Sequence, residues 1–354
     1  MNLRKINFSD YKSHTILAPN WIGDTAMAAP FFASLRSNFP DCKMKVIVNP
    51  WVEGLVRNYP WVDEVIKLDS NSIWYLIKSF RFGDFKNKHS RDIFWILPNS
   101  FRSALMSYLA KGKSRIGYST GFRKYLLSNP IFLPKIKSQN LIDYYLGLLV
   151  ANGLSPISER ISIEIRSDLL KISMNTLGKF VDLSKRPLIG IHPGAFFGSS
   201  KTWDPKSFGL LAERLTDKQN ANILIFGGPG EKELTEMVLK HSNGKALNFF
   251  GKDNLLILPG LLSMLDAFIS GDTGPLHIAS LVGTPTISIF GPTDPKMTAP
   301  RGSNNLYLYK NLDCSPCFQR ICPLNHHDCM KKITVEEVEN RLKDILKKNK
   351  GERR

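Results

Sequence analysis

The sequence predicts an α/β protein with two doubly wound domains, each built around a parallel sheet with helices on both faces. Three observations predict this fold class. Short apolar segments of strand length alternate with longer segments of helical periodicity. The alternation is interrupted over residues 155–185 and then begins again. The length of 354 residues also suits two domains, since a domain usually has about 100–200 residues.

The first half of the chain opens with a strand, a glycine turn and a helix. The short apolar segment 14–18 predicts a buried strand, residues 19–23 form the turn, and the helix follows over residues 24–39. The other elements expected in this half are strands at 45–48, 63–68 and 93–97, and a helix at 101–110. Because helices separate the strands, we expect the strands to be parallel.

The second half follows residues 155–185, where the pattern is poor, and we expect that region to be a linker. Pro205 suits the first turn of a helix, where no backbone donor is needed. The expected strands are 188–192, 223–226, 266–270 and 286–290, and the expected helices are 205–215, 231–241, 275–281 and 335–347. We therefore expect domains over 1–175 and 176–330, with a cleft between them, and a C-terminal segment over 331–354.

Composition and hydropathy exclude several classes of protein. Apolar residues make up 43% of the chain and charged residues 22%, which excludes a fully disordered chain, a collagen and a coiled coil. The best candidate for a membrane span, residues 255–269, is interrupted by Pro259 and Asp266, so we expect no integral membrane protein. The N-terminal residues 1–14 contain no apolar signal segment, which favours a cytoplasmic location.

The chain is strongly basic. It has 48 Lys and Arg against 31 Asp and Glu, a formal net charge of +17. Such a charge favours a nucleic acid, an anionic membrane surface or a phosphorylated substrate as a partner, or serves only solubility. A nucleic acid is the least favoured partner, because the sequence contains no zinc-finger, RNP or helix-turn-helix signature.

Four of the five cysteines, Cys314, Cys317, Cys322 and Cys329, lie within sixteen residues. In a cytoplasmic protein, such a cluster suggests metal binding more than disulfides. Its spacing, C-x2-C-x4-C-x6-C, does not match a standard zinc module, although two histidines lie inside it. The sequence therefore leaves a structural or adventitious metal site and no metal site as open alternatives, and it predicts no catalytic metal.

The segment GDTGPLH, residues 271–277, lies between an expected strand and an expected helix. Pro275 suits the first helical position, and the free N–H groups at the start of a helix can bind a phosphate. The carboxyl edge of an open α/β sheet is also where ligands bind. The simpler interpretation is that Asp272 and Thr273 only cap the helix and that His277 is structural.

Two further segments also follow expected strands. In HPGAFFGSSKTW, residues 192–203, small residues such as Gly194 allow an anion to approach the backbone, and Lys201 offers a positive charge. A surface lysine in a flexible loop is an equally good interpretation of this segment. In NWIGD, residues 20–24, Asp24 is placed at a helix start, where it could act as a general base. From this motif alone, the better interpretation is an acid that the helix dipole favours at the N-terminus.

The absence of several motifs disfavours some classes of enzyme. The sequence has no G-x-x-x-x-G-K-[ST] loop and no G-x-G-x-x-G after its first strand, which disfavours a P-loop NTPase and a standard dinucleotide dehydrogenase. It also has no D-x-D segment to hold a metal beside a pyrophosphate. If a nucleotide sugar binds here, protein charge must stabilise the leaving group.

Taken together, these segments resemble glycosyltransferase family 9, the ADP-heptose:lipopolysaccharide heptosyltransferases. The resemblance spans almost the whole chain, from residue 16 to the last helix. Its tail, CSPCFQRICPLNHHDC, is most similar to the heptosyltransferase II branch, which adds the second heptose to the inner core. The segments that carry the resemblance are PNWIGDTAM, HPGAFFGSSKTW, GGPGE, SGDTGPLHIAS and IFGPTDP.

The resemblance implies a GT-B fold, in which two Rossmann-like domains face each other across a cleft. Residues 1–175 would bind the acceptor, residues 176–330 the nucleotide-sugar donor, and the helix in 331–354 would pack back on the first domain. The implied donor is ADP-L-glycero-β-D-manno-heptose, and the implied acceptor is the heptosylated Kdo–lipid A core. The implied transfer inverts the anomeric centre without a metal or other cofactor, at the anionic cytoplasmic face of the inner membrane.

The resemblance also implies roles for single residues. Asp24 matches the base that takes the proton from the acceptor hydroxyl. Lys201 matches the lysine at the donor phosphates, and Asp272 matches the acid near the donor heptose. The remaining residues implied at the donor site are Thr273 and Gly274 at the pyrophosphate, His277, Gly194, and Glu231 and Lys252 near the nucleoside.

Other functions stay open at this point. A related family 9 enzyme, of the heptosyltransferase I or III type or specific for another sugar, could act on a surface glycan. A nucleotide-sugar binder without catalysis is disfavoured because both Asp24 and Lys201 are present. A basic nucleic-acid binder is supported by net charge alone.

Overall fold

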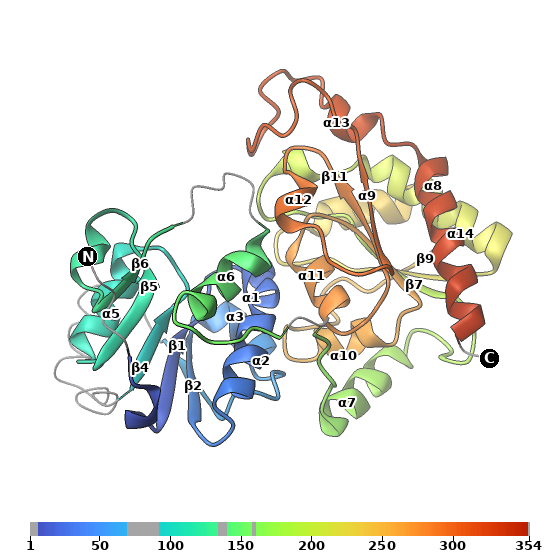
Figure 1. The fold of residues 1–354 in the computed structure, drawn as a ribbon. Coiled ribbons are helices and arrows are strands. Elements are labelled where there is room, and N and C mark those ends of the chain that lie inside the picture. The colour runs from blue at the N-terminus through green and yellow to red at the C-terminus, as the bar shows by residue number, and fades with distance from the viewer. Residues whose placement is uncertain (1–5, 69–91, 134–139, 158–160, 353–354) are drawn as a thin grey trace. The chain divides into compact units, whose positions relative to one another are not determined.

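The computed structural model describes residues 6–68, 92–133, 140–157 and 161–352. The chain divides into two compact units, residues 1–161 and 162–354. Within the described ranges, each unit contains one six-stranded sheet whose paired strands are all parallel (Figure 1). This arrangement confirms the predicted α/β class with two doubly wound sheets.

The sheet of the first unit has the strand order β3-β2-β1-β4-β5-β6. Its strands are β1 (Ser13–Leu17), β2 (Lys43–Val48), β3 (Glu64–Lys67), β4 (Ile93–Ile96), β5 (Ser114–Tyr118) and β6 (Asn129–Ile131). Ile16 of β1 is in register with Val46 on one side and with Trp95 on the other. Successive strands are added outward from β1 to β3 on one side and from β4 to β6 on the other, so the switch point of this sheet lies between β1 and β4.

The helices of the first unit are α1 (Ile22–Met27), α2 (Ala29–Asn38), α3 (Pro50–Val56), α5 (Phe101–Leu109) and α6 (Leu141–Val150). The helix predicted over residues 24–39 is in fact two helices, α1 and α2. Pro30 lies in the first turn of α2. Because proline has no N–H, it cannot continue the hydrogen-bond ladder of α1, and a new helix begins there.

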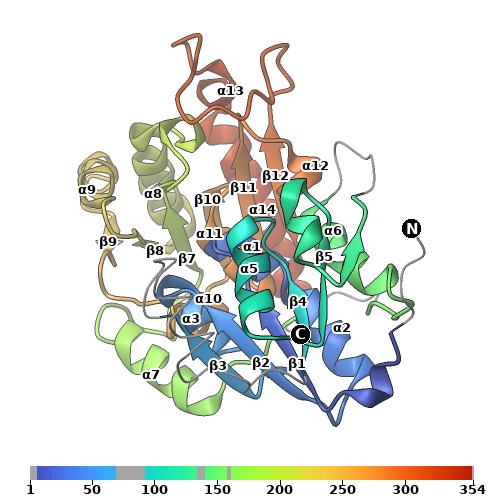
Figure 2. The same ribbon diagram turned by 90° about the vertical axis from the view of Figure 1, so that its left-hand side faces the viewer.

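The sheet of the second unit has the order β12-β11-β10-β7-β8-β9. Its strands are β7 (Leu188–His192), β8 (Asn222–Ile225), β9 (Ala246–Asn248), β10 (Ala267–Gly271), β11 (Thr286–Phe290) and β12 (Asn305–Tyr309). Its helices are α7 (Ser167–Leu177), α8 (Pro205–Gln219), α9 (Lys232–His241), α10 (Leu258–Ser263), α11 (Gly274–Leu281), α12 (Pro295–Thr298), α13 (Asp328–Lys331) and α14 (Val335–Glu352). Figure 2 shows α8 and α9 beside each other in this unit.

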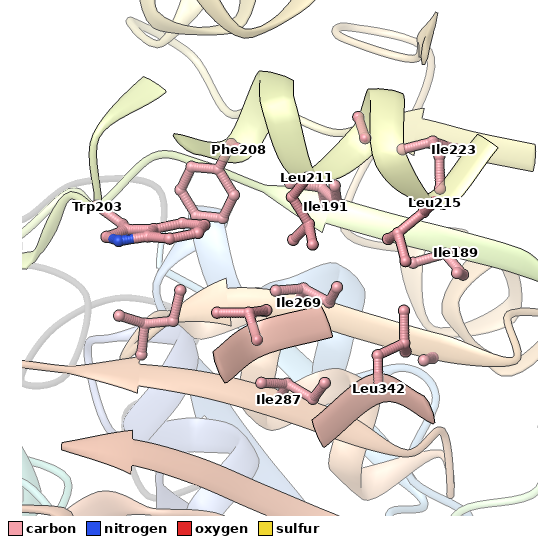
Figure 3. Close-up of a cluster of buried hydrophobic side chains, with 14 of the residues drawn as sticks. Ile189, Ile191, Trp203, Phe208, Leu211, Leu215, Ile223, Ile269, Ile287 and Leu342 are labelled. Carbon is pink, nitrogen blue, oxygen red and sulfur yellow. The ribbon is translucent and has the colours of Figure 1, made fainter. Parts of the chain in front are cut away.

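A continuous apolar core lies between the second sheet and its helices. Side chains of α8, such as Phe208 and Leu211, pack against strand residues such as Ile191 and Ile269 (Figure 3). Leu342 of α14 belongs to the same cluster and is fully buried. The expected packing of this last helix on the first domain stays a prediction.

The region expected to be a linker, residues 155–185, contains helix α7. Ser173 of α7 donates a hydrogen bond to the carbonyl O of Ile257 at 3.1 Å. A Cβ on Gly260 would lie 2.4 Å from Ser173 Oγ, so the missing side chain lets α10 approach α7 closely. These contacts place α7 in the second unit, and the division falls between residues 161 and 162 rather than at the expected 175/176.

Candidate active site

Polar residues gather where the two central strands of the second sheet end. β7 ends at His192, and its register partner on β10 is Ser270. β7 and β10 lie side by side, with β8 and β9 beyond β7 and with β11 and β12 beyond β10. Open α/β sheets bind ligands at such a switch point, outside the carboxyl ends of the strands.

Asp272, the residue after β10, is the centre of a buried polar network. Lys201 Nζ lies 2.6 Å from Asp272 Oδ2 and 3.2 Å from the Asp272 carbonyl O. The Thr293 hydroxyl donates to Oδ2 at 2.9 Å, and His277 Nε2 lies 3.3 Å from Oδ1. Both carboxylate oxygens therefore have partners, and those partners come from three separate segments of the chain.

The network keeps Asp272 ionised although it is buried. Burial alone would raise the pKa of this carboxyl group, because a charge is poorly solvated in the protein interior. The hydrogen bond from His277 and the charge on Lys201 outweigh burial, and they hold the pKa of Asp272 well below its usual value. Asp272 is thus a permanent anion that fixes the Lys201 ammonium, rather than a group that exchanges protons near neutral pH.

Lys201 reaches Asp272 from the loop after β7, where it ends the 3-10 helix η4 (Ser199–Lys201). A Cβ on Gly271 would lie 2.8 Å from the Lys201 carbonyl O, so a glycine there lets this loop approach β10. The ammonium also lies 4.8 Å from the ring centroid of Phe197. An ammonium has three N–H donors, and Asp272 accepts two of them, so the third is available to a ligand.

The start of α11 lies next to this network. Thr273 is its N-cap residue, but the Thr273 side chain does not cap the helix; its hydroxyl lies 2.8 Å from Ser270 Oγ. Gly274 begins the helix and Pro275 occupies its first turn. The backbone N–H groups of a first helical turn, together with the helix dipole, favour a bound anion. A phosphate could therefore be held between this helix start and the Lys201 ammonium.

A second polar cluster lies at the ends of β7 and β8. His192 Nε2 lies 3.1 Å from Glu231 Oε2, and the Gly228 N–H donates to the same oxygen at 2.6 Å. A Cβ on Gly194 would lie 2.1 Å from the Glu231 carboxyl group, so a larger residue there would displace that carboxylate from its present position. Burial raises the pKa of Glu231, but His192 and the Gly228 N–H outweigh it, and the pKa is lowered overall.

Lys252, which was also expected near the nucleoside, is exposed in the loop after β9. Its ammonium lies 5.8 Å from the ring centroid of Phe180. The neighbouring Asp253 is more buried, and burial raises its pKa, whereas His192 lowers it. The role of Lys252 stays a prediction, and Asp253 is a further titratable group close to the Glu231 cluster.

Asp24 lies in the first unit, in the first turn of α1 and after the central strand β1. The turn before it is fixed by side chains that follow β2: Asn49 Nδ2 donates to Asn20 Oδ1 at 2.7 Å, and Trp51 Nε1 donates to the Asn20 carbonyl O at 2.6 Å. The Asp24 carboxylate is close enough to Tyr145 that, after burial, it contributes to raising the pKa of that phenol. Asp24 thus occupies the switch point of its own sheet, beside β4.

Comparisons with known proteins decide the family. A sequence model of glycosyltransferase family 9 (heptosyltransferase) matches residues 86–327, which is more than half of the chain. The chain belongs to glycosyltransferase family 9. It is therefore a glycosyltransferase, and the resemblance found in the sequence is confirmed.

Relatives within family 9 match over nearly their whole length. The chain is 29% identical to lipooligosaccharide heptosyltransferase 2 of Campylobacter jejuni over 93% of this chain and 97% of the relative. The fold is similar to that of ADP-heptose LPS heptosyltransferase II of Escherichia coli, with a TM-score of 0.81 and 23% identity over 96% of this chain and 99% of the other. A family 9 structure from Veillonella parvula gives a TM-score of 0.87 at 21% identity, over 98% of this chain and 100% of the other. These likenesses confirm the predicted GT-B fold.

The cysteines of this family 9 chain are free thiols. Burial, followed by the neighbouring Cys317 and Cys314, raises the pKa of the Cys329 thiol to about 11. Within the described ranges, no three His, Cys, Asp or Glu side chains are grouped so that they could hold a metal ion. In the same part of the chain, no helix combines the length and the hydropathy that a membrane span needs.

The structure groups the sequence-predicted donor residues into two clusters at one sheet edge. Lys201 and His277 both contact Asp272, Thr273 and Gly274 lie at the adjacent helix start, and Gly194 lies next to the Glu231 carboxyl group. Sequence reasoning missed His192 and Thr293 as functional residues. His192 is the last residue of β7 and Thr293 lies in the loop after β11, and both belong to segments that carry the family resemblance; that position was the available signal.

Proposed function

We propose that this chain transfers L-glycero-D-manno-heptose from ADP-heptose to the heptosyl-Kdo–lipid A inner core in lipopolysaccharide biosynthesis, with inversion at the anomeric carbon. One observation carries the proposal: in a family 9 chain, the buried Lys201–Asp272 pair lies beside the start of α11, at the switch point of the second sheet. A site of this kind suits a diphosphate leaving group. The names of the relatives support ADP-heptose as the donor and a lipopolysaccharide as the acceptor, and the family resemblance supplies the heptosyl-Kdo–lipid A core.

The donor diphosphate binds between Lys201 and the first turn of α11 in this proposal. Asp272 fixes the ammonium so that its third N–H points to a phosphate oxygen, and Thr273 and Gly274 offer backbone N–H groups. As the bond to the sugar breaks, negative charge grows on the departing ADP. A fixed ammonium and a helix dipole stabilise that charge without reorganisation, so we expect the transfer to need no divalent cation.

The nucleoside part of the donor lies against the Glu231 cluster in this proposal. Glu231 stays ionised and is held by His192 and the Gly228 N–H, so its carboxylate can accept a hydrogen bond from a ribose hydroxyl. Gly194 leaves room for that approach because a side chain there would collide with Glu231. Lys252 is the further residue that we propose near the nucleoside.

Asp24 is the general base in this proposal. It removes the proton from the acceptor hydroxyl while that oxygen attacks the anomeric carbon from the face opposite the diphosphate, which inverts the configuration. Its place after β1 matches the edge at which α/β sheets bind ligands. The acceptor is phosphorylated and lies in an anionic leaflet, and a net charge of +17 favours approach of the chain to that surface.

The deciding experiment measures ADP release from ADP-heptose with and without heptosyl-Kdo–lipid A, using wild type and Asp24→Asn. The proposal expects release that depends on the acceptor and is lost in the variant. Donor binding without release would contradict the acceptor and direct the search to other glycans. Failure to bind ADP-heptose, while another nucleotide sugar binds, would contradict the donor.

A further inference from the structure

An exposed aromatic surface lies at the carboxyl edge of the first unit's sheet. Phe122 and Tyr125 belong to the 3-10 helix η3 (Gly121–Tyr125), which follows β5, and Phe132 follows β6 directly. Their side chains are 80%, 73% and 67% exposed. Parallel neighbouring strands end at the same edge, and the Ser119 N–H donates to the Ile131 carbonyl O at 2.7 Å, so the two segments leave the sheet together. We name Phe122, Lys124, Tyr125 and Phe132 the β5–β6 surface.

The backbone beneath this surface is anchored. Arg123 is only 1% exposed, and its Nη1 donates to the Pro98 carbonyl O at 2.6 Å and to Asn99 Oδ1 at 3.0 Å. The buried arginine therefore holds η3 against the segment after β4. The adjacent aromatic residues are left on the outside, and a group of exposed rings, unlike a single one, is typical of an interaction site.

The chain segment that forms this surface is basic. The described residues 93–133 contain six Lys or Arg and no Asp or Glu. Lys124 is exposed, with its ammonium 5.0 Å from the ring centroid of Tyr125. Aromatic rings that sit at the headgroup level, next to lysines that meet anionic headgroups, are typical of protein surfaces that lie on a bilayer.

We propose that the β5–β6 surface docks on an anionic lipid bilayer. The proposal rests on the proposed function in one respect, because it explains how the enzyme meets an acceptor that is embedded in a membrane. Phe122, Tyr125 and Phe132 enter the headgroup layer, and Lys124 meets lipid phosphates. Contact of this kind combines apolar burial with charge attraction, so binding should weaken as salt is raised.

The test is co-sedimentation of the full chain with vesicles of phosphatidylcholine, with and without phosphatidylglycerol. We expect binding to the anionic vesicles, and a loss of roughly tenfold or more in affinity for the double variant Phe122→Ser/Tyr125→Ser. Tyr307→Ser is the matched control, because Tyr307 is an exposed aromatic residue on β12 of the other unit. Equal binding by wild type and the double variant would overturn the proposal.

Transfer to two forms of the acceptor separates the bilayer from the sugar as the partner. We expect the double variant to lose activity on acceptor embedded in vesicles and to keep it on a deacylated, water-soluble acceptor. Loss on the soluble acceptor would show that the surface binds the saccharide and would overturn the bilayer assignment. If vesicle binding depends on Phe122 and Tyr125 but the wild-type chain transfers no heptose, the docking role of this surface is supported and the proposed function is refuted.

A separate observation concerns the cysteine-rich segment, residues 314–329, which packs on the loop that carries Lys201. His327 Nε2 donates to the Ser200 carbonyl O at 2.7 Å. The Ser200 N–H donates to the Arg320 carbonyl O at 3.1 Å, and the Ser200 hydroxyl donates to the Gln319 carbonyl O at 2.5 Å. Ser200, the residue before Lys201, is therefore held on three sides by this segment.

The same segment also contacts the loop that carries Thr293. The Phe318 N–H donates to the Pro292 carbonyl O at 2.8 Å, and the Ser315 hydroxyl donates to the Gly291 carbonyl O. Thr293 in turn donates to Asp272. The cysteine-rich segment thus joins the two loops whose side chains meet at the Asp272 carboxylate.

His327 has a left-handed backbone conformation. Its φ of 58° lies in the left-handed region, which is unfavourable for a residue other than glycine. That conformation precedes α13, and the His327 side chain reaches Ser200. We infer that His327 is a positioning residue that fixes the Lys201 loop and, through it, the ammonium at the donor phosphates. This inference rests on the proposed role of Lys201.

The test compares His327→Ala with His326→Ala, a neighbouring histidine whose Nδ1 accepts from the Asp328 N–H instead. We expect His327→Ala to raise the KM for ADP-heptose by about tenfold, the loss of one hydrogen bond to a positioned group, and His326→Ala to leave it unchanged. In a Lys201→Ala background the effect of His327→Ala should disappear, because both act through one group. His327→Gln, which keeps an N–H donor, should restore part of the affinity.

Two results would overturn the inference. The first is equal KM values for ADP-heptose in His327→Ala and His326→Ala. The second is an effect of His327→Ala that stays as large in the Lys201→Ala background, which would show a general loss of structure. Hydrogen exchange over residues 196–203 gives a readout that needs no activity: protection should fall in His327→Ala and not in His326→Ala. If protection falls in His327→Ala but the wild-type chain does not bind ADP-heptose, the role of His327 in packing this loop is retained and the proposed donor site is refuted.

Discussion

Lys201 and Asp272 form a buried ion pair in which one ammonium binds both the side chain and the backbone of the same aspartate, at 2.6 Å from Oδ2 and 3.2 Å from the carbonyl O. Two contacts to one residue fix the ammonium in direction as well as in position. The carboxylate is saturated by Lys201, Thr293 and His277, so it serves as an anchor and not as a proton carrier.

Lys201→Ala tests the phosphate role of the ammonium. We expect turnover to fall by about 10²–10³-fold and the KM for ADP-heptose to rise, since a charge aimed at the leaving group is lost. Lys201→Arg keeps the charge but changes its shape, and it should restore only part of the rate. Steady-state kinetics with saturating acceptor give both parameters. Normal turnover and normal donor affinity in Lys201→Ala would refute the role.

Asp272→Asn should destabilise the second unit strongly. The substitution leaves the Lys201 ammonium, which is 11% exposed, without its counter-charge. Removal of one partner from a buried pair costs about 3–5 kcal/mol of unfolding free energy. Urea unfolding at neutral pH measures this loss. Thr293→Val removes one uncharged donor from the same carboxylate and should cost clearly less, which separates the charge from the hydrogen bond.

The same pair predicts how stability depends on pH. The folded-state pKa of Asp272 lies below the ordinary value for an aspartate, about 3.9, so the group contributes stability above that value and loses it as pH falls through the folded-state pKa. The difference in unfolding free energy between wild type and Asp272→Asn should therefore be constant from neutral pH to about pH 5 and should shrink below pH 4. A difference that shrinks between pH 7 and pH 5 would assign the effect to another group.

Asp24→Asn tests the proposed base with almost no change in side-chain size. We expect transfer to fall by about 10²–10⁴-fold, the usual contribution of a positioned general base, while ADP-heptose binding stays near that of wild type. Calorimetric titration with ADP-heptose and an ADP-release assay with acceptor measure the two properties on the same preparation. An active variant would remove Asp24 as the base.

The sequence predicted the fold class and many of the elements because apolar periodicity reports burial directly. Strands Leu188–His192 and Thr286–Phe290 were predicted with their observed bounds. The break at Pro30 and the packing of α7 on α10 were missed, because both depend on contacts rather than on periodicity. Asp272 and Lys201 lie 71 positions apart, and their meeting follows from parallel strands ending at one edge. The contact of His327 with Ser200 spans 127 positions and leaves no local signal.

The two polar clusters of the second unit should bind different parts of the donor, and variants in each can be compared with donor fragments. Glu231→Gln removes the charge at the nucleoside end, so binding of AMP and of ADP should weaken alike, by about 10- to 100-fold for a lost charged hydrogen bond. Lys201→Ala should weaken ADP far more than adenosine, because the contact proposed for Lys201 is with a phosphate. His192→Gln should weaken AMP and ADP binding in the same way but less than Glu231→Gln, because His192 Nε2 lies 3.1 Å from Glu231 Oε2 and orients that carboxylate. If Glu231→Gln left adenosine and AMP affinities unchanged, the nucleoside would have to lie elsewhere on this sheet edge.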